Sequence, residues 1–123
     1  MPRLLSVSLT EQAVIDRTKT VTRRLGWRNL TPGTRLTLCR KVMGRSLANL
    51  DGSRTVEPLV RLAEVRVVSV RRERLEQIPD ADLAREGFSG WDAFDFIVFF
   101  CDRMRCTPQT EVTRIEWEYI DAQ

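Results

Sequence analysis

The stretch Arg17-Thr18-Lys19-Thr20-Val21-Thr22-Arg23-Arg24 carries the most information about the fold of this 123-residue sequence. Its centre is rich in residues that favour extended backbone, so it predicts a strand that begins near Lys19 and leads to Gly26-Trp27. Lys19 and Arg24 bracket the hydroxyl side chains of this strand. In most proteins such a pattern is only a solvated face, so the neighbouring elements decide its meaning.

Two short elements precede this stretch. Leu4 to Leu9 alternates apolar and small polar residues, which predicts a first strand. Thr10 offers a helix N-cap with Glu11 behind it, and the apolar residues that follow predict a short helix from Thr10 to about Arg17.

The elements that follow are mostly strands. After a turn at Thr31-Pro32-Gly33, Leu36 and Leu38 alternate with more polar residues, which predicts a half-buried strand. The segment 45–58 has no periodicity and is expected to be a surface loop or a hairpin. Leu59 to Val70 is the strongest strand signal, and Arg71-Arg72-Glu73-Arg74 after it is expected to be a solvated turn.

The last third of the sequence predicts two helices and a final strand. A short helix begins at Pro79-Asp80 and ends at Gly87, and Ser89 is expected to cap the next helix together with Asp92. An apolar stripe at helical spacing and a set of aromatic residues are expected in the core: Trp91, Phe94, Val98 and Cys101 for the stripe, with Phe96, Phe99 and Phe100.

The closing strand is expected over 112–120. Its alternation places Ile115, Trp117 and Tyr119 on one face and the two glutamates between them on the other. Strands dominate both ends of the sequence and the helices are short. The expected fold is therefore a single α+β domain, 1–123, with a mostly antiparallel sheet that curls into a β-barrel and two or three short peripheral helices.

Composition limits the function. Apolar residues make up 42% and charged residues 30% of the chain, as in globular proteins. The sequence has no histidine and three loosely spaced cysteines, so we expect no metal site, no cofactor, no disulfide framework and no catalysis that uses histidine. No apolar run is long enough to span a bilayer and no signal peptide is recognisable, so a cytoplasmic location is expected.

Charge adds one detail. The formal net charge is +3, which permits a nucleic-acid partner without requiring one. Of the 20 basic residues only Lys19 and Lys41 are lysine. A GC-rich genome explains such a bias, but the two lysines are also candidates for positions that need an amine, because a buried amine can lose its proton near neutral pH and a guanidinium cannot.

The segment from Arg17 to Arg24 resembles the signature of the ASCH family, with Lys19 and Arg24 at the matching positions and Arg17 where the family has glycine. Pro32-Gly33-Thr34 is similar to a turn of the same family, Ala84 to Phe88 resembles its helical insertion, and the closing strand also fits. The resemblance extends from Leu4 to Tyr119. It implies a PUA-like β-barrel whose pocket holds RNA or a modified nucleoside.

Some small members of the family hydrolyse the amide of N4-acetylcytidine with a Lys, a Thr three residues later and a distant Glu. The resemblance places these roles on Lys19, Thr22 and Glu86. Lys19 would be the base, and Thr22 would be the nucleophile or would orient a water. Glu86 would carry a proton to the leaving nitrogen, while Arg24 would hold a phosphate or the developing oxyanion.

Two functions therefore remain open. The first is an RNA- or nucleoside-binding module with a basic cleft lined by Lys19, Thr22, Arg24 and, at its mouth, Lys41. The second is an amidohydrolase that uses the same pocket with Glu86. Trp27 either stacks on a base or covers one end of the barrel. A protein-interaction domain has little support, since no exposed apolar stripe is apparent.

The spacing of the candidate residues poses a geometric problem. In a flat strand Lys19 and Thr22 would point to opposite faces. They can converge only if Lys19 lies in the turn that leaves the first helix, or if a bulge intervenes. Cys39, opposite the two leucines of its strand, is expected to face the barrel interior or the pocket and to be inert without an activating histidine.

Overall fold

The computed structural model describes residues 3–40, 46–48, 50–56 and 59–121. Its regular elements, in chain order, are β1 (Arg3–Ser6), the 3-10 turn η1 (Ser8–Thr10), α1 (Glu11–Ile15), β2 (Val21–Arg24), β3 (Arg35–Cys39), β4 (Ser46–Ala48), β5 (Arg54–Val56), β6 (Arg61–Arg74), the 3-10 turn η2 (Leu75–Gln77), α2 (Asp82–Glu86), α3 (Ala93–Met104) and β7 (Glu111–Tyr119).

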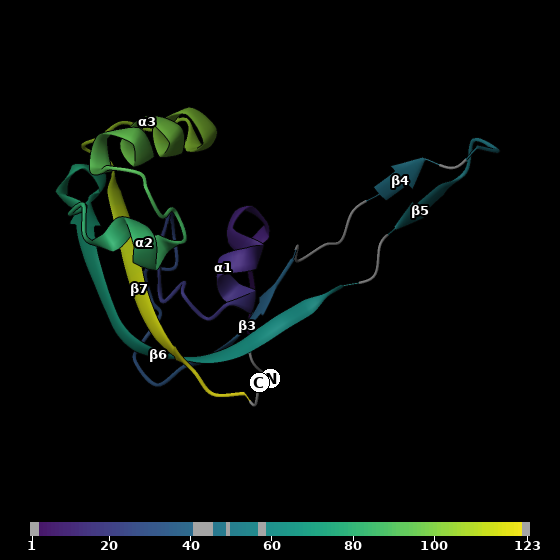
Figure 1. Cartoon of the computed structure of the whole chain (residues 1–123), viewed down its shortest axis with the longest axis horizontal. Helices are drawn as coiled ribbons and strands as arrows, with labels where there is room; N and C mark the ends of the chain where they lie inside the picture. Colours follow the sequence, from purple (N-terminus) through teal and green to yellow (C-terminus); the bar gives the residue numbers. More distant parts are fainter. Residues whose placement is uncertain (1–2, 41–45, 49, 57–58, 122–123) are drawn as a thin grey trace.

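Five strands form one curled sheet in the order β1-β3-β6-β7-β2. The β1–β3 pair is parallel and the other three pairs are antiparallel, as expected for a mostly antiparallel sheet. The 14-residue strand β6 pairs with β3 through its first half and with β7 through most of its length. Its register with β7 shifts between Val67 and Ser69, and such irregularities bend a sheet. The sheet therefore curves into a half-barrel (Figure 1).

The apolar interior falls into two clusters. The inner face of the half-barrel holds Leu5, Val14, Leu36, Val65 and Trp117 among others. The second cluster lies where α3 covers the end of the sheet, and it contains Leu75, Ile78, Leu83, Phe96, Phe100 and Val112. The predicted faces of β7 are confirmed, because Ile115 and Trp117 are buried in the first cluster and Tyr119 packs against it. α1 lies on the concave side of the sheet in Figure 1. α2 packs on the other face of β7, because Asp82 binds Arg114, which alternates with the inward-facing Ile115.

The segment 45–58 contains a hairpin. β4 and β5 pair only with each other, and the hairpin extends away from the body of the molecule in Figure 1. The expectation of a surface loop or hairpin is thus confirmed for the part of this segment that the structure describes.

Two strand predictions need correction. The β3 strand is not half-buried, because every residue from Leu36 to Cys39 is buried; the Thr37 hydroxyl, on the face predicted to be polar, donates to the Glu64 carboxylate. The segment 71–74 is not a turn but the end of β6. Arg72 pairs across the sheet with Glu111 at 2.9 Å, and such cross-strand pairs extend the ladder beyond the apolar part of the strand.

The helix predictions hold in outline but differ in detail. α1 is shorter than predicted, and Thr10 is its N-cap residue without a side-chain capping bond. α2 ends at Gly87, as predicted, with a left-handed φ of 97°. α3 is capped by Asp92 rather than Ser89: the Asp92 carboxylate accepts the backbone N–H of Asp95 at 2.8 Å.

The predicted buried stripe of α3 is wrong. Phe96 and Phe100 are buried, whereas Phe94 is 73% and Val98 52% exposed. The helix is apolar on nearly every side, so periodicity alone cannot select the face that packs. An exposed apolar surface therefore exists, contrary to expectation. No helix in the described part of the chain is long and apolar enough to cross a bilayer.

Candidate functional site

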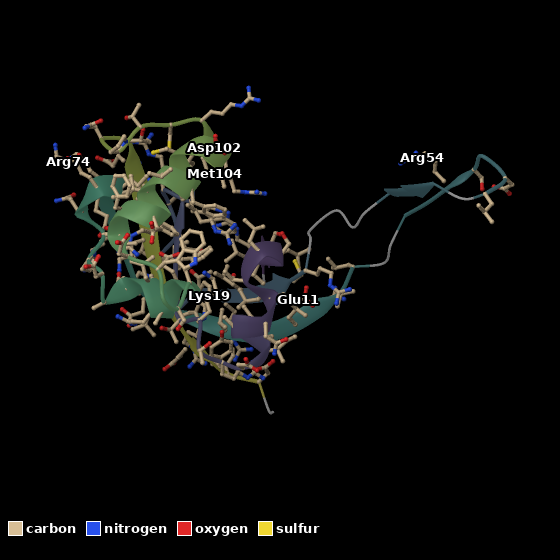
Figure 2. The ribbon with its side chains drawn as sticks, turned by 45° about the horizontal axis from the view of Figure 1, so that its top comes forward. Glu11, Lys19, Arg54, Arg74, Asp102 and Met104 are labelled. Carbon is tan, nitrogen blue, oxygen red and sulfur yellow. The ribbon has the colours of Figure 1, made fainter. Side chains whose placement is uncertain are left out.

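A cavity of about 280 Å³ opens between β2, the segment after β1, the end of α2 and one face of α3. Four of the residues singled out in the sequence line it: Lys19, Thr22, Arg24 and Glu86. Figure 2 shows Lys19 inside the body of the molecule and Met104, another lining residue, at the end of α3. The remaining lining residues are Ser6, Val7, Ser8, Leu9, Thr10, Arg23, Phe88, Phe96, Phe99, Phe100 and Arg103.

Lys19 lies in the turn that leaves α1, which is one of the two placements that allow it to converge with Thr22. Its backbone N–H donates to the carbonyl of Ala13, and β2 begins two residues later. Its own carbonyl accepts bonds from the Trp117 indole at 3.0 Å and from the Tyr119 hydroxyl. Both polar groups of the Lys19 backbone, the N–H and the carbonyl, therefore have hydrogen-bond partners.

The Lys19 amine is buried and faces Glu86. Its Nζ donates to the backbone carbonyl of Glu86 and lies 3.8 Å from the carboxylate oxygen Oε1. Burial lowers the pKa of Lys19 from 10.5 to about 8; Glu86 opposes this shift, while Arg24 and Arg23 add to it. An amine with this pKa can be neutral at a useful fraction near neutral pH, which a general base requires.

Glu86 is the last residue of α2 and is held by two cations. Its Oε2 accepts from Arg23 at 2.8 Å, while Oε1 faces Lys19. The helix can end here because Gly87 takes the left-handed conformation, and a Cβ on Gly87 would come within 2.8 Å of the Thr10 side chain. This close approach holds the end of α2 against the start of α1, both of which border the cavity.

Arg23 lines the same cavity and is the residue that sequence reasoning missed. Its buried guanidinium contacts three carboxylates, with Glu73 at 3.1 Å, Asp82 at 2.7 Å and Glu86 at 2.8 Å. Arg114 also binds Asp82, at 3.1 Å. Although burial alone would raise the pKa of Asp82, bonds from Arg114 and Arg23 hold it below its usual value.

One signal for this network was present in the sequence. Asp82 and Glu86 are four residues apart and therefore share one face of a helix. Two acids on the buried side of a short helix require cations opposite them. Arg23 lies one residue from Thr22 and so points away from it in a strand, towards the layer that α2 occupies. Only the tertiary packing of α2 on β2 shows which cation meets these acids.

Thr22 and Arg24 form the other side of the site. Arg24 Nε donates to the Thr22 hydroxyl oxygen at 3.1 Å, and Arg24 Nη2 donates to the carbonyl of Ser6 at 2.6 Å. Ser6 ends β1 and Arg24 ends β2, the two edge strands, so this bond bridges the open side of the half-barrel. Among the described residues no carboxylate forms an ion pair with Arg24.

Aromatic rings form the wall opposite these polar groups. Phe88 packs against Phe96 and Phe99 with ring centroids 5.4 and 5.5 Å apart. Phe96, Phe99, Phe100 and Arg103 recur at helical spacing and share one face of α3. The cavity thus has a charged side and an apolar side, an arrangement common in small-molecule sites.

The other candidate residues lie elsewhere. Trp27 packs against the barrel core under the Arg3 guanidinium, 4.3 Å from its ring centroid, and is not among the lining residues. Lys41 lies outside the described residues. Cys39 is buried in β3, its thiol donates to the Leu5 carbonyl at 3.5 Å, and burial raises its pKa. Within the described residues no group of three or more Cys, Asp or Glu side chains could hold a metal ion.

Arg17 stands where the ASCH signature has glycine, and its φ is +65°. This is the left-handed region that glycine adopts without strain, so the turn has the geometry that a glycine would give. Arg17 is held there by an ion pair with Asp121 at 3.1 Å, and its guanidinium lies 4.7 Å from the Tyr119 ring centroid.

No family model matches the sequence, and no curated protein matches it in a sequence search. Solved structures do match. A DUF984 protein from Enterococcus faecalis is 14% identical with a TM-score of 0.63, over 98% of this chain and 81% of the other. An ASCH domain from Lactobacillus crispatus is 12% identical with a TM-score of 0.54, over 90% and 70%.

A third structure, ASCH from Zymomonas mobilis, is 13% identical with a TM-score of 0.56, over 98% of this chain and 67% of the other. Identities this low carry information about the fold alone. The likeness covers nearly the whole chain, including the curled sheet and the helices that border the cavity. The fold of this chain is therefore that of the ASCH domains.

Proposed function

We propose that the cavity binds a cytosine nucleoside that carries an acyl group on N4, and that the protein hydrolyses this amide. The observation that supports the proposal most directly is the buried Lys19 amine, with its lowered pKa, beside Glu86 in a cavity that Thr22 also lines. These are the positions that the resemblance to N4-acetylcytidine amidohydrolases assigns to the reaction.

The chemistry follows from the roles of the groups. Neutral Lys19 takes the proton of the nucleophile, which is the Thr22 hydroxyl or a water held by it, as this nucleophile attacks the acyl carbon. The carbonyl oxygen becomes an oxyanion, which the Arg24 guanidinium stabilises. The C–N bond then breaks, and the proton passes from Lys19, directly or through Glu86, to the departing N4. Where Thr22 is the nucleophile, a water then hydrolyses the acyl ester formed on its hydroxyl. By either route one water is consumed, and cytidine and a carboxylic acid are the products.

The shape of the cavity favours a nucleoside over a length of RNA. Its volume, about 280 Å³, lies at the lower end of the range of about 300–1,000 Å³ that is typical of small-molecule sites. Its aromatic wall suits one base. Many surface arginines are also matched by acids, among them Arg40 with Glu11, Arg66 with Glu118, Arg72 with Glu111 and Arg85 with Glu116. Such pairing weakens a continuous phosphate-binding surface.

Binding of RNA or a nucleoside without chemistry is the alternative, and the sequence alone ranks it first. The observation that favours it is Arg24, which faces the cavity without a carboxylate partner among the described residues and suits a phosphate. The two functions differ in one measurable property, which is release of the acyl group.

The test is incubation of the purified protein with N4-acetylcytidine, followed by chromatography for cytidine and acetate. We expect turnover by the wild type and none by Lys19→Arg, because a guanidinium cannot act as a base. Calorimetric titration of both proteins with cytidine should show similar binding. Binding without acetate release by the wild type would exclude the hydrolase and leave the binding module. Salt-sensitive binding of a short RNA strand would identify the partner of that module.

A further inference from the structure

We infer that the cavity takes its nucleoside as a 5′-phosphate, and that Arg103 on α3 binds the phosphate group. This inference rests on the proposed function and adds the substrate class. It starts from the charges around the cavity, which are not balanced.

The buried ionic network next to the cavity does not have more carboxylates than cations. Its three buried carboxylates, Glu73, Asp82 and Glu86, already pair with five cations, which are Lys19, Arg23, Arg71, Arg85 and Arg114. A fourth acid, Glu116, is shared by Arg85 and Arg114. It cannot neutralise any other cation that lines the cavity.

Two lining cations remain, and they are Arg24 and Arg103. Arg24 uses its donors for the Thr22 hydroxyl and the Ser6 carbonyl. Arg103 lies over the Phe99 ring, 5.5 Å from its centroid, and within the described residues it forms no ion pair with a carboxylate. A guanidinium presents donors in a planar fork that matches phosphate geometry. Arg103 thus offers an exposed, unneutralised phosphate contact at the cavity.

Arg103 lies where the 5′-phosphate of a nucleotide bound in this cavity is expected. From Glu86, the wall continues through the Phe88 ring to the Phe99 ring, 5.5 Å away, and then to the Arg103 guanidinium at the end of α3. In an N4-acylated cytidine the amide and the ribose lie at opposite ends of the base. With the amide beside Lys19 and Glu86 and the base along the phenylalanines, the 5′ oxygen points towards Arg103.

A second explanation for Arg103 is that a cation in the last turn of a helix offsets the helix dipole. The chain offers a matched control for it. Arg105 is the C-cap residue of the same helix and is exposed, but it is not among the residues that line the cavity. Arg103→Gln and Arg105→Gln each remove one positive charge at the same helix end, and only the first changes the cavity.

The experiment compares kcat/KM for N4-acetylcytidine and its 5′-monophosphate in the wild type, Arg103→Gln and Arg105→Gln. A charge-assisted hydrogen bond corresponds to roughly a tenfold change or more. We expect the wild type to prefer the monophosphate by about tenfold, and Arg103→Gln to lose this preference, so that its kcat/KM values for the two compounds become equal through a higher KM for the monophosphate. Arg105→Gln should behave like the wild type, and added salt should weaken the preference.

Equal wild-type rates on both compounds would overturn the inference and leave the proposed function intact. The same holds if Arg105→Gln loses the preference as Arg103→Gln does. If no acetate is released from either compound, titration with cytidine and with cytidine 5′-monophosphate decides the matter. Tighter binding of the monophosphate, lost only in Arg103→Gln, keeps the phosphate site without the hydrolase. Equal binding of the two, or no binding, removes the phosphate site as well.

Discussion

The Nζ of Lys19 lies 3.8 Å from the Oε1 of Glu86, although 67 positions separate the two residues in the sequence. Neither side chain is more than 3% exposed. An isolated buried ion pair of this kind offers little net stability, because desolvation offsets the attraction. The pair is therefore more informative about chemistry than about folding, and it leads to the first two predictions.

The first prediction concerns the pH dependence of turnover. If neutral Lys19 is the base, kcat/KM for N4-acetylcytidine should rise about tenfold per pH unit below pH 8 and level off above it, since the pKa of Lys19 is about 8. Lys19→Arg should lower kcat by about a hundredfold or more at every pH. A flat profile between pH 6 and 9 in the wild type would exclude Lys19 as the base.

The second prediction concerns stability. The folded pKa of Lys19, about 8, is below its unfolded value of 10.5, so between these values the unfolded chain binds more protons. The free energy of unfolding therefore rises with pH in this window as the penalty for burying the ammonium disappears. Lys19→Met should lack this contribution. Denaturant titrations at pH 7.5 and pH 10 give the free energy of unfolding of the wild type and of Lys19→Met. The difference between the two proteins at each pH cancels the titration of Tyr119 and the cysteines, which both proteins share. A difference that does not change with pH would contradict the lowered pKa.

Arg23 provides the third prediction. Arg23→Met leaves Glu73, Asp82 and Glu86 without their shared partner, which should cost about 3–5 kcal/mol in the free energy of unfolding. The matched control is Arg66→Met, because Arg66 pairs with Glu118 at 3.2 Å on the surface and should cost less than about 1 kcal/mol. Equal losses in the two variants would show that the buried network does not hold α2 on β2.

Gly87 provides the fourth prediction. Both Gly87 and Gly90 have positive φ, at 97° and 87°, so an alanine at either position costs about 1 kcal/mol in backbone strain. Only at Gly87 does the added Cβ clash, 2.8 Å from Thr10 Cγ2. Gly87→Ala should therefore destabilise the protein by about 1–3 kcal/mol more than Gly90→Ala and also reduce turnover, because α1 and α2 must separate. Thermal unfolding and the acetate assay measure both effects.

The correct predictions concern features that depend on residues close together in the sequence. The β2 and β7 strands, the end of α2 at Gly87 and the faces of β7 follow from propensity, glycine conformation and alternation. The three residues of the ASCH resemblance, Lys19, Thr22 and Glu86, do line one cavity, and whether they act as catalysts stays a prediction.

The wrong or missing predictions share one cause: each of these features depends on which elements pack together in the tertiary structure. α3 is apolar on most sides, so only the position of the sheet selects Phe96 and Phe100 over Phe94 and Val98 for burial. The role of Arg23 depends on α2 meeting β2, which no short pattern encodes. Arg72 continues β6 because β7 lies beside it and supplies Glu111.

The carbonyl of Lys19 is anchored by the Trp117 indole, 98 positions later in the chain, and by the Tyr119 hydroxyl, 100 positions later. Contacts of such high sequence separation form late in folding and make it slow. While the chain is being synthesised, β1, α1 and β2 emerge early, but the Lys19 carbonyl lacks both of these partners until β7 has left the ribosome. A nascent chain that lacks β7 therefore lacks the anchors of the Lys19 carbonyl and also the strand with which β2 pairs.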